Sequence, residues 1–324
     1  MKPISRNSFA TTGLASADDR LEYWNAYNRS NLVGLQSSSL SADGLEARQT
    51  NFLLEAMHVA DISGNDHIVE RNPRLIRQYP KEAVFACHIV RGSAYFVQKG
   101  QCMTISAGET LIYDTRVPLI YGFPTEMHPF LVDMSADDFT ERTGIRSELL
   151  PCKIGTATRT ESMLNHSLRR ELFDFVRSPN EQDGCLLSDH TYALLHSMMR
   201  CRDGGEVHPA TSVACLLMAK DYVSQNLAES SLSPQSIADA VGISLRHLNR
   251  LFALDGESPA DFIWEQRTVR AHADLINPAM KRLSIGEIAF ACGFSSQAHF
   301  SRAVRARFGL SPRALRSAVD LRAD

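Results

Sequence analysis

Positions 284–312 read SIGEIAFACGFSSQAHFSRAVRARFGLSP, and this stretch predicts a helix-turn-helix. Ser284 and Glu287 have the spacing of a capping box, in which each side chain bonds a backbone N–H at the start of a helix. Apolar residues then recur at helical spacing as far as Gly293. Gly293 can adopt the positive φ that closes such a helix, so a first helix and a tight turn are expected here.

The second helix of this stretch can begin at Ser295 or Ser296, because either hydroxyl suits an N-cap. Its apolar residues recur at intervals of four on the face that would pack inward: Phe300, Val304 and Phe308. Its opposite face carries donor-rich side chains and no acid: Gln297, Ser301, Arg302 and Arg305. In a major groove Arg binds guanine, Gln binds adenine, and Ser bonds either a base or a phosphate. The alternative is the solvated face of an ordinary helical hairpin.

The same pattern occurs a second time, earlier in the chain. Residues 233–259, SPQSIADAVGISLRHLNRLFALDGESP, match the first stretch at offsets of 51 to 53. Gly242 corresponds to Gly293, Arg250 corresponds to Arg302, and both stretches end in Gly-x-Ser-Pro. An isolated hairpin has no reason to recur with all of these features, so the repeat favours two recognition helices in tandem over a solvated face.

These two motifs resemble the AraC/XylS family of transcription regulators. IAFACGF, followed by HFSRAVRARFG and LSP, is similar to the family signature, and the resemblance covers roughly residues 211–316. It implies a DNA-binding unit of seven helices, with a linker helix over 261–276, whose two recognition helices enter successive major grooves. It places these side chains against bases: Arg246, Asn249 and Arg250 in the first recognition helix, and Gln297, Ala298, Ser301 and Arg302 in the second. Together with Arg305 of the donor-rich face, they are the predicted DNA-binding residues.

Three positions depart from the family pattern. Val304 stands where Phe is usual, and Ala253 and Leu254 stand where basic residues are common. These departures affect how strongly the first hairpin is expected to contact the DNA backbone, and they do not affect the expected fold.

Composition indicates a soluble globular protein of two domains. The 324 residues are 44% hydrophobic and 22% charged, which is typical of that class. No apolar run approaches the ~18 residues of a membrane span, and the first thirty residues lack the apolar core of a signal peptide, so no membrane association and a cytoplasmic location are expected. The net charge is −3, which argues against a general polyanion binder, but residues 211–324 hold 13 basic against 11 acidic residues. The small basic excess gathers on the predicted recognition helices.

Seven cysteines are scattered along the chain without a Cys-x-x-Cys pair: Cys87, Cys102, Cys152, Cys185, Cys201, Cys215 and Cys292. An odd number at irregular spacing predicts neither a zinc site nor a disulfide framework. Reduced thiols are expected, and a redox sensor is the alternative.

Short strands are predicted between residues 52 and 134, separated by Gly, Pro and Asp turns. Their number favours a small barrel or sandwich, which gives an α+β fold class for the whole chain. This part is similar to the cupin-like sensor domain common in the same family. Metal-dependent cupins hold their metal with a His-x-His pair followed by an acid, and the chain contains no His-x-His. No metal, no other cofactor and no catalytic residues are therefore predicted.

A barrel without a metal can still bind a small molecule in an apolar pocket that contains a few polar groups. The predicted effector-binding residues are aromatic or polar members of the predicted strands: Phe85, His88, Tyr95, Tyr113 and Tyr121. Each could instead be an ordinary core or surface residue, and His88 could be a hydrogen-bonded core histidine. The aromatic side chains favour an aromatic or planar effector.

Helical periodicity returns at Thr158 and continues to Met199, interrupted by Ser178-Pro179-Asn180. The resemblance implies that these helices form a homodimer surface, and packing back onto the barrel is the alternative. Four segments are expected: a cupin-like sensor (1–157), dimerisation helices (158–201), a linker rich in Gly and charge (202–210), and a double helix-turn-helix (211–324).

The sequence thus predicts a regulator that binds promoter DNA and responds to a small effector bound by its N-terminal domain. The family most often activates transcription, through RNA polymerase. Two other functions stay open: a DNA-binding protein whose barrel binds no ligand and serves dimer or partner contacts, and a cupin-type enzyme with a regulatory helical unit.

Overall fold

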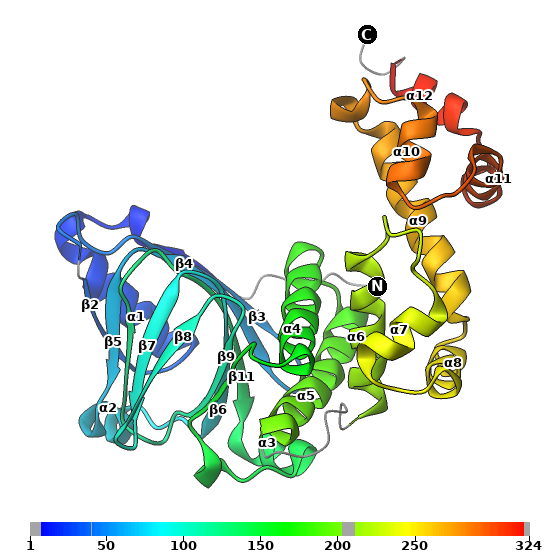
Figure 1. Cartoon of the computed structure of the whole chain (residues 1–324). Helices are drawn as coiled ribbons and strands as arrows, with labels where there is room; N and C mark the ends of the chain where they lie inside the picture. The colour runs from blue at the N-terminus through cyan, green and yellow to red at the C-terminus, as the bar shows by residue number, and fades with distance from the viewer. Residues whose placement is uncertain (1–7, 40, 203–210, 321–324) are drawn as a thin grey trace. The chain divides into compact units, whose positions relative to one another are not determined.

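The computed structural model describes residues 8–39, 41–202 and 211–320 (Figure 1). The chain divides into two compact units, Met1–Ala214 and Cys215–Asp324. The first unit is built on two β-sheets and the second is helical, so the α+β fold class is confirmed. The predicted linker lies, apart from Arg202, outside the described residues.

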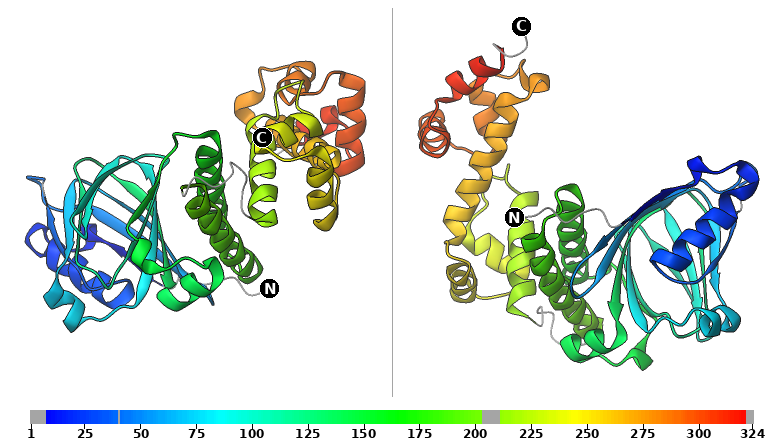
Figure 2. Two further views of the ribbon diagram at one scale, coloured as in Figure 1. Left: turned by 60° about the horizontal axis from the view of Figure 1, so that its bottom comes forward. Right: turned by 180° about the vertical axis from the view of Figure 1, so that it is seen from behind.

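Two antiparallel sheets face each other in the first unit (Figures 1 and 2). In spatial order the seven-stranded sheet contains β1 (Ser8–Thr11), β3 (Ala47–Leu53), β4 (His58–Gly64), β11 (His128–Ser135), β6 (Ala83–Arg91), β9 (Thr110–Asp114) and β12 (Cys152–Ile154). The five-stranded sheet contains β2 (Gln36–Ser39), β5 (His67–Arg71), β10 (Leu119–Phe123), β7 (Ser93–Gln98) and β8 (Gln101–Ser106). The two sheets do not close into one ring, so the predicted barrel is an open one.

Strands β6 to β10 lie within the region where short strands separated by turn residues were predicted. Lys99-Gly100 closes the β7–β8 hairpin with φ values of +51° and +73°, the left-handed pair that a two-residue hairpin turn requires. Strands β1 and β2 were not predicted, because their sequences SFAT and QSSS carry no apolar alternation. Both are edge strands, held by pairing to β3 and β5.

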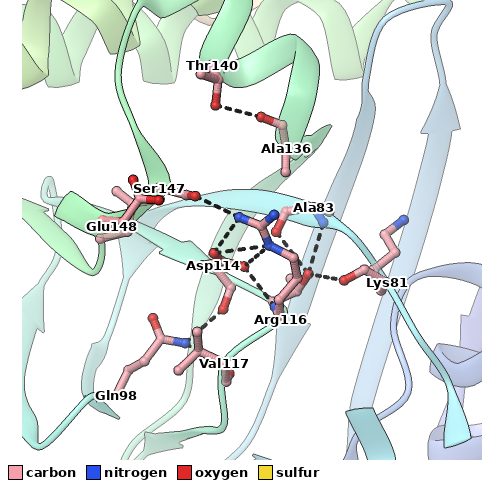
Figure 3. A network of polar contacts seen from close by, with 12 residues as sticks. Lys81, Ala83, Gln98, Asp114, Arg116, Val117, Ala136, Thr140, Ser147 and Glu148 are labelled. Carbon is pink, nitrogen blue, oxygen red and sulfur yellow. Dashed lines mark hydrogen bonds and ion pairs between the residues drawn. The ribbon is translucent and has the colours of Figure 1, made fainter. Parts of the chain in front are cut away.

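Apolar side chains from both sheets fill the space between them, and α1 (Arg20–Asn31) adds Trp24 to this core. One end of the core is fastened by a polar network (Figure 3). Gln98 of the five-stranded sheet donates through Nε2 to the carbonyl oxygen of Asp114 in the seven-stranded sheet, at 2.8 Å. The Asp114 carboxylate accepts from Arg116, which also donates to Ser147 at 2.7 Å. These bonds join the sheets where the apolar core ends.

Three helices cover the other face of the seven-stranded sheet: α3 (Ala136–Thr143), α4 (Arg159–Arg177) and α5 (Glu181–Arg202), as Figures 1 and 2 show. A short helix, α2 (Pro73–Gln78), follows β5. A capping box of Thr158 and Glu161 opens α4, at the residue where helical periodicity was expected to return. Phe175 of α4 packs edge-on against Phe52, and the Tyr192 hydroxyl of α5 donates to the carbonyl oxygen of Ala56 at 3.2 Å. The two long helices therefore pack onto the sheet, the alternative that the sequence left open beside dimerisation.

The second unit is a run of α-helices: α6 (Ser212–Gln225), α7 (Pro234–Val241), α8 (Leu245–Leu254), α9 (Pro259–Ile276), α10 (Ile285–Ala291), α11 (Gln297–Phe308) and α12 (Pro312–Asp320). α7 with α8, and α10 with α11, form the two predicted hairpins, and α9 connects them (Figure 1). Ser284 and Glu287 form the predicted capping box. Gly242 and Gly293 take φ values of +78° and +80°, so both turns have the conformation that favours glycine.

The recurring Gly-x-Ser-Pro ends one helix and starts the next. Gly309 ends α11 in the left-handed conformation, and Gly256 follows α8 with a φ of +90°. Ser258 accepts from the backbone N–H of Asp261 at 3.1 Å, and Ser311 accepts from that of Ala314 at 3.2 Å. The proline after each serine takes the first helical position, where no N–H is needed. The repeated motif is thus a sharp corner after each recognition helix.

Candidate nucleic-acid interface and N-terminal cavity

The second helices of the two hairpins, α8 and α11, each have one buried face and one exposed face. Ser244 caps α8 and Ser296 caps α11, each by accepting from the backbone N–H three residues on. The buried faces hold Leu248, Leu251 and Phe252 in α8, and Phe300 and Val304 in α11. Val304, which replaces the usual Phe, is fully buried, so this departure is accommodated in the core.

The predicted DNA-facing side chains lie on the exposed faces of these helices. Of the seven residues placed against bases, Ser301 is half-buried. The other six are exposed: Arg246, Asn249, Arg250, Gln297, Ala298 and Arg302. Arg305, one turn beyond Ser301, is exposed too. Because α8 and α11 come from repeated hairpins, the chain presents two such donor sets. In that setting Arg and Gln side chains bind base edges, and Ser and Asn bond bases or phosphates.

The arginines of α11 differ in their availability. Arg302 and Arg305 make no hydrogen bond or ion pair with the described residues. Arg307 donates through Nε to Glu265 of α9 at 2.7 Å, so its guanidinium is occupied within the protein. Two of the three arginines can therefore contact a ligand without first breaking an ion pair.

A cavity of about 70 Å³ lies between the two sheets, beneath α1. Three of the predicted effector-binding residues, Phe85, Tyr113 and Tyr121, line it. Their rings contact one another at angles of 70° and 89°, with centroids 5.7 and 5.9 Å apart. Burial raises the pKa of both tyrosine hydroxyls well above its ordinary value, so both stay neutral hydrogen-bonding groups.

His88 and Tyr95, also predicted to bind the effector, do not line this cavity. His88 lies three residues from Phe85 in β6, and an odd separation in a strand places two side chains on opposite faces. Tyr95 lies on the outer face of β7, where its ring covers Gly122: a Cβ atom at Gly122 would come within 2.0 Å of Cζ of Tyr95. Neither residue is available to an effector between the sheets.

His88 belongs instead to a polar cluster between the seven-stranded sheet and α4. Asn165 donates through Nδ2 to the carbonyl oxygens of Gly155 and Glu161, so its Oδ1 accepts from the Thr110 hydroxyl at 2.6 Å. That hydroxyl can then only accept from His88 Nδ1, 3.0 Å away. Burial, with help from the nearby cationic Arg169, lowers the pKa of His88 to about 3. The histidine is thus a neutral core residue that links β6 and β9 to α4.

Three polar residues that line the cavity, Asn28, Gln49 and His67, were not predicted as site residues. Gln49 of β3 is 1% exposed, and its Oε1 has no hydrogen-bond partner among the described residues. His67 of β5 is buried, and its ring stacks on Phe123 with centroids 5.1 Å apart. Ala47, Gln49 and Asn51 are two residues apart and therefore share one face of a strand. This spacing could have predicted polar side chains on the inward face, but β3 was not recognised individually.

The described residues contain no cluster of three or more His, Cys, Asp or Glu side chains that could hold a metal ion. Among the helices that the structure describes, none has both the length and the apolar character needed to cross a membrane.

Comparisons with known proteins support the nucleic-acid assignment of the helical unit. A family profile described as a helix-turn-helix domain matches residues 237–318. The transcriptional activator NphR of a Rhodococcus species is 26% identical over 269 residues, which cover 79% of this chain and 76% of NphR. The regulator ArgR of Pseudomonas aeruginosa is 36% identical over 110 residues, 34% of this chain and 31% of ArgR. The stronger identity is thus confined to a shorter segment.

A likeness in fold extends over both units. The crystal structure of the AraC-like transcriptional activator CuxR has a TM-score of 0.51 and covers 82% of this chain and 95% of its own. The sequence identity is 15%, so this likeness concerns the fold alone. It accords with a two-sheet domain followed by a helical domain.

Proposed function

Because the chain belongs to the AraC/XylS family of DNA-binding transcription regulators, we propose that α8 and α11 read two segments of one promoter site. The residues proposed to face the bases or phosphates are Arg246, Asn249 and Arg250 of α8, and Gln297, Ala298, Ser301, Arg302 and Arg305 of α11. The observation that carries this proposal is the pair of exposed, acid-free donor sets on two repeated helices, each with a serine N-cap.

Selection of bound duplexes from a random pool by the full chain tests this proposal. Two preferred sequence elements are expected, separated by about 10 base pairs, because successive major grooves on one face of B-DNA are one helical turn apart. Arg250→Ala should relax the preference within one element and Arg302→Ala within the other. Recovery of duplexes with no shared sequence, or with a single element that both variants relax, would contradict tandem readout.

We propose further that the N-terminal domain binds a small effector in the cavity between its sheets and that the bound form activates transcription. The support is the cavity itself and the name of NphR, a transcriptional activator whose similarity covers 79% of this chain and so reaches into the N-terminal domain. Effector binding would shift the population of chains competent for DNA. Footprinting on the selected site, with and without fractions of a metabolite extract, tests this: occupancy that no fraction alters would leave the cavity without a regulatory role.

The regulator is proposed to act as a homodimer through the solvent-facing side of α4 and α5, where Phe173 and Leu186 remain 44% and 48% exposed. Sedimentation of the full chain and of the Phe173→Lys, Leu186→Lys variant would compare their oligomeric states. A wild-type monomer that still footprints the complete site would refute the dimer.

RNA polymerase is the proposed partner in activation, and the cytoplasm is the proposed location because the target is promoter DNA. The matched relatives named above are transcription regulators, which favours ligand binding rather than catalysis in the N-terminal unit. Transcription of the selected promoter with purified polymerase, with and without the chain, tests activation directly.

A further inference from the structure

Three polar groups next to Gln49 fix which of its hydrogen-bonding atoms the N-terminal cavity presents. Asn51 Nδ2 lies 2.9 Å from Ser8 Oγ and 2.8 Å from Tyr27 Oη, and these two oxygens are themselves in hydrogen-bond contact at 2.8 Å. Three bonds among three groups need three hydrogens. The Asn51 amide supplies two and Tyr27 supplies one, whereas the flipped amide would leave only the two hydroxyl hydrogens. The orientation of the Asn51 amide is therefore fixed.

This orientation also fixes Gln49. The Asn51 Oδ1 atom can only accept, so Gln49 donates to it through Nε2, at 2.9 Å. Gln49 Oε1 is then left as a hydrogen-bond acceptor without a partner among the described residues, on a side chain that lines the cavity. A buried acceptor without a partner is costly, so a ligand that donates a hydrogen bond here is favoured over one that does not.

His67 provides a second acceptor on the cavity wall. Its Nδ1 lies 2.8 Å from the carbonyl oxygen of Asn65, which can only accept, so Nδ1 carries the hydrogen. Burial lowers the pKa of His67, so the ring is neutral and Nε2 is an acceptor. Tyr113, which also lines the cavity, makes no hydrogen bond with the described residues through its hydroxyl.

Apart from the Asn28 amide, whose Nδ2 donates to the carbonyl oxygen of Trp24 at 3.0 Å, and the Tyr121 hydroxyl, the remainder of the wall is apolar and strongly aromatic. Within the described part of the chain, no Asp, Glu, Lys or Arg side chain lines the cavity. A carboxylate or ammonium group would lose its hydration without gaining an opposite charge, so a charged ligand is disfavoured. Rings of Phe85, Tyr121 and Phe123 offer edges and faces to a planar ligand. A sugar is disfavoured as well, because its several hydroxyls exceed the polar groups that the wall provides.

The volume limits the size of the ligand. The cavity of about 70 Å³ is roughly half of the ~150 Å³ in which an apolar protein cavity binds benzene. A single ring with a substituent of one or two heavy atoms can enter if the lining side chains move apart slightly, and a fused ring system or a ring with bulky substituents cannot.

We propose that the effector is a neutral, single-ring aromatic molecule with a hydrogen-bond donor, of which phenol is the simplest example, and that its donor binds Gln49 Oε1. This proposal rests on the proposed function, in which the effector occupies this cavity. Gln49 acts as the specificity-determining residue. Its Oε1 accepts a hydrogen bond from a ligand that has a donor, and it stays unpaired beside a ligand of the same shape without one.

Titration calorimetry of the full chain tests this with four probes: phenol, fluorobenzene, benzoate and xylose. Fluorobenzene has nearly the shape of phenol but no donor, benzoate is charged, and xylose is a sugar. Phenol should bind, fluorobenzene should bind about tenfold more weakly, which is the effect of one hydrogen bond, and the other two should give no signal. Equal binding of phenol and fluorobenzene, tighter binding of benzoate or xylose, or no binding of any probe would overturn the proposal.

Two glutamine variants complete the test. Gln49→Met should lower the affinity for phenol to that for fluorobenzene. Gln98→Met is the matched control, because Gln98 is equally buried and also has an unpartnered Oε1, but it does not line the cavity. If Gln49→Met does not fold, the ratio of the two wild-type affinities still decides. A metabolite fraction that alters the footprint while no neutral ring binds refutes this ligand class alone, and phenol binding without any change in the footprint refutes the proposed regulation.

Discussion

Arg267 of α9 lies directly against Gly293 in the turn of the second hairpin: a Cβ atom on Gly293 would come within 2.7 Å of Arg267 Nε and 2.3 Å of the Leu227 carbonyl oxygen. Arg267 is 3% exposed and donates to the carbonyl oxygens of Leu227 and Glu229 at 3.0 and 2.7 Å. The turn of one hairpin, the long connecting helix and the segment before α7 therefore meet at one buried guanidinium. A side chain at position 293 would displace it.

Gly293→Ala should destabilise the helical unit by about 1–3 kcal/mol, because it combines a strained positive φ with a close backbone contact. Denaturant unfolding followed through Trp264, in a Trp24→Phe background, measures this unit separately. The matched control is Gly286→Ala within α10, where a Cβ atom meets nothing closer than 3.9 Å. That variant should be more stable by about 0.5–1 kcal/mol. Equal midpoints for the two variants would refute the role of Gly293.

Arg302→Ala should weaken binding to the selected site by about 1–3 kcal/mol and relax sequence preference at the base pair it reads, since a bidentate contact to guanine would be lost. Arg307→Ala is the matched control in the same helix, because its guanidinium is bound to Glu265. It should leave sequence preference unchanged. Competition binding against single-base variants of the site distinguishes these results. If Arg302→Ala weakens specific and random duplexes equally, Arg302 contacts only phosphate.

Thr110→Val should destabilise the N-terminal unit by about 1–3 kcal/mol, because both His88 Nδ1 and Asn165 Oδ1 would lose their buried partner. Thr110→Ser retains the hydroxyl and should cost less than the valine variant. Denaturant unfolding monitored through Trp24, in a Trp264→Phe background, makes the comparison. A valine variant as stable as the serine variant would show that this cluster contributes nothing to stability.

The stability of the N-terminal unit should fall as the pH is lowered through the weakly acidic range. The pKa of His88 is lowered by burial from 6.5 to about 3, so the unfolded chain binds a proton at this residue that the folded chain does not. Its contribution is complete above about pH 6.5 and is lost progressively towards pH 3, with a slope approaching about 1.4 kcal/mol per pH unit. Burial also lowers the pKa of His58 and His67, which adds to the slope in the same direction.

His88→Asn isolates this contribution, because its amide can replace the Nδ1 donor but does not titrate. The free energy of unfolding, measured between about pH 7 and 4, should depend less steeply on pH in this variant. The decrease in slope should correspond to about one fewer proton taken up on unfolding. An unchanged slope would place the proton uptake at other residues.

The helical unit and its candidate interface could be predicted from the amino-acid sequence alone. Each signal is local: the capping box of Ser284 and Glu287, the turn glycines, and the Ser-Pro corners all act within one or two helical turns. The exposed face of α11 follows from the same periodicity, because burying Phe300 and Val304 turns Arg302 and Arg305 outward. Even so, the sequence did not reveal that Arg307 is paired with Glu265, 42 residues away.

The set of residues that meet in the N-terminal cavity could not be predicted without the folded structure. Strand alternation shows that Phe85 and His88 face opposite ways, but it does not tell which of them faces the other sheet. That choice depends on pairing between strands distant in sequence and on the helices that cover one face. The edge strands β1 and β2, the inward Gln49 and the outward Tyr95 became evident only when both sheets were in place, because strands have no local signal equivalent to a helix cap.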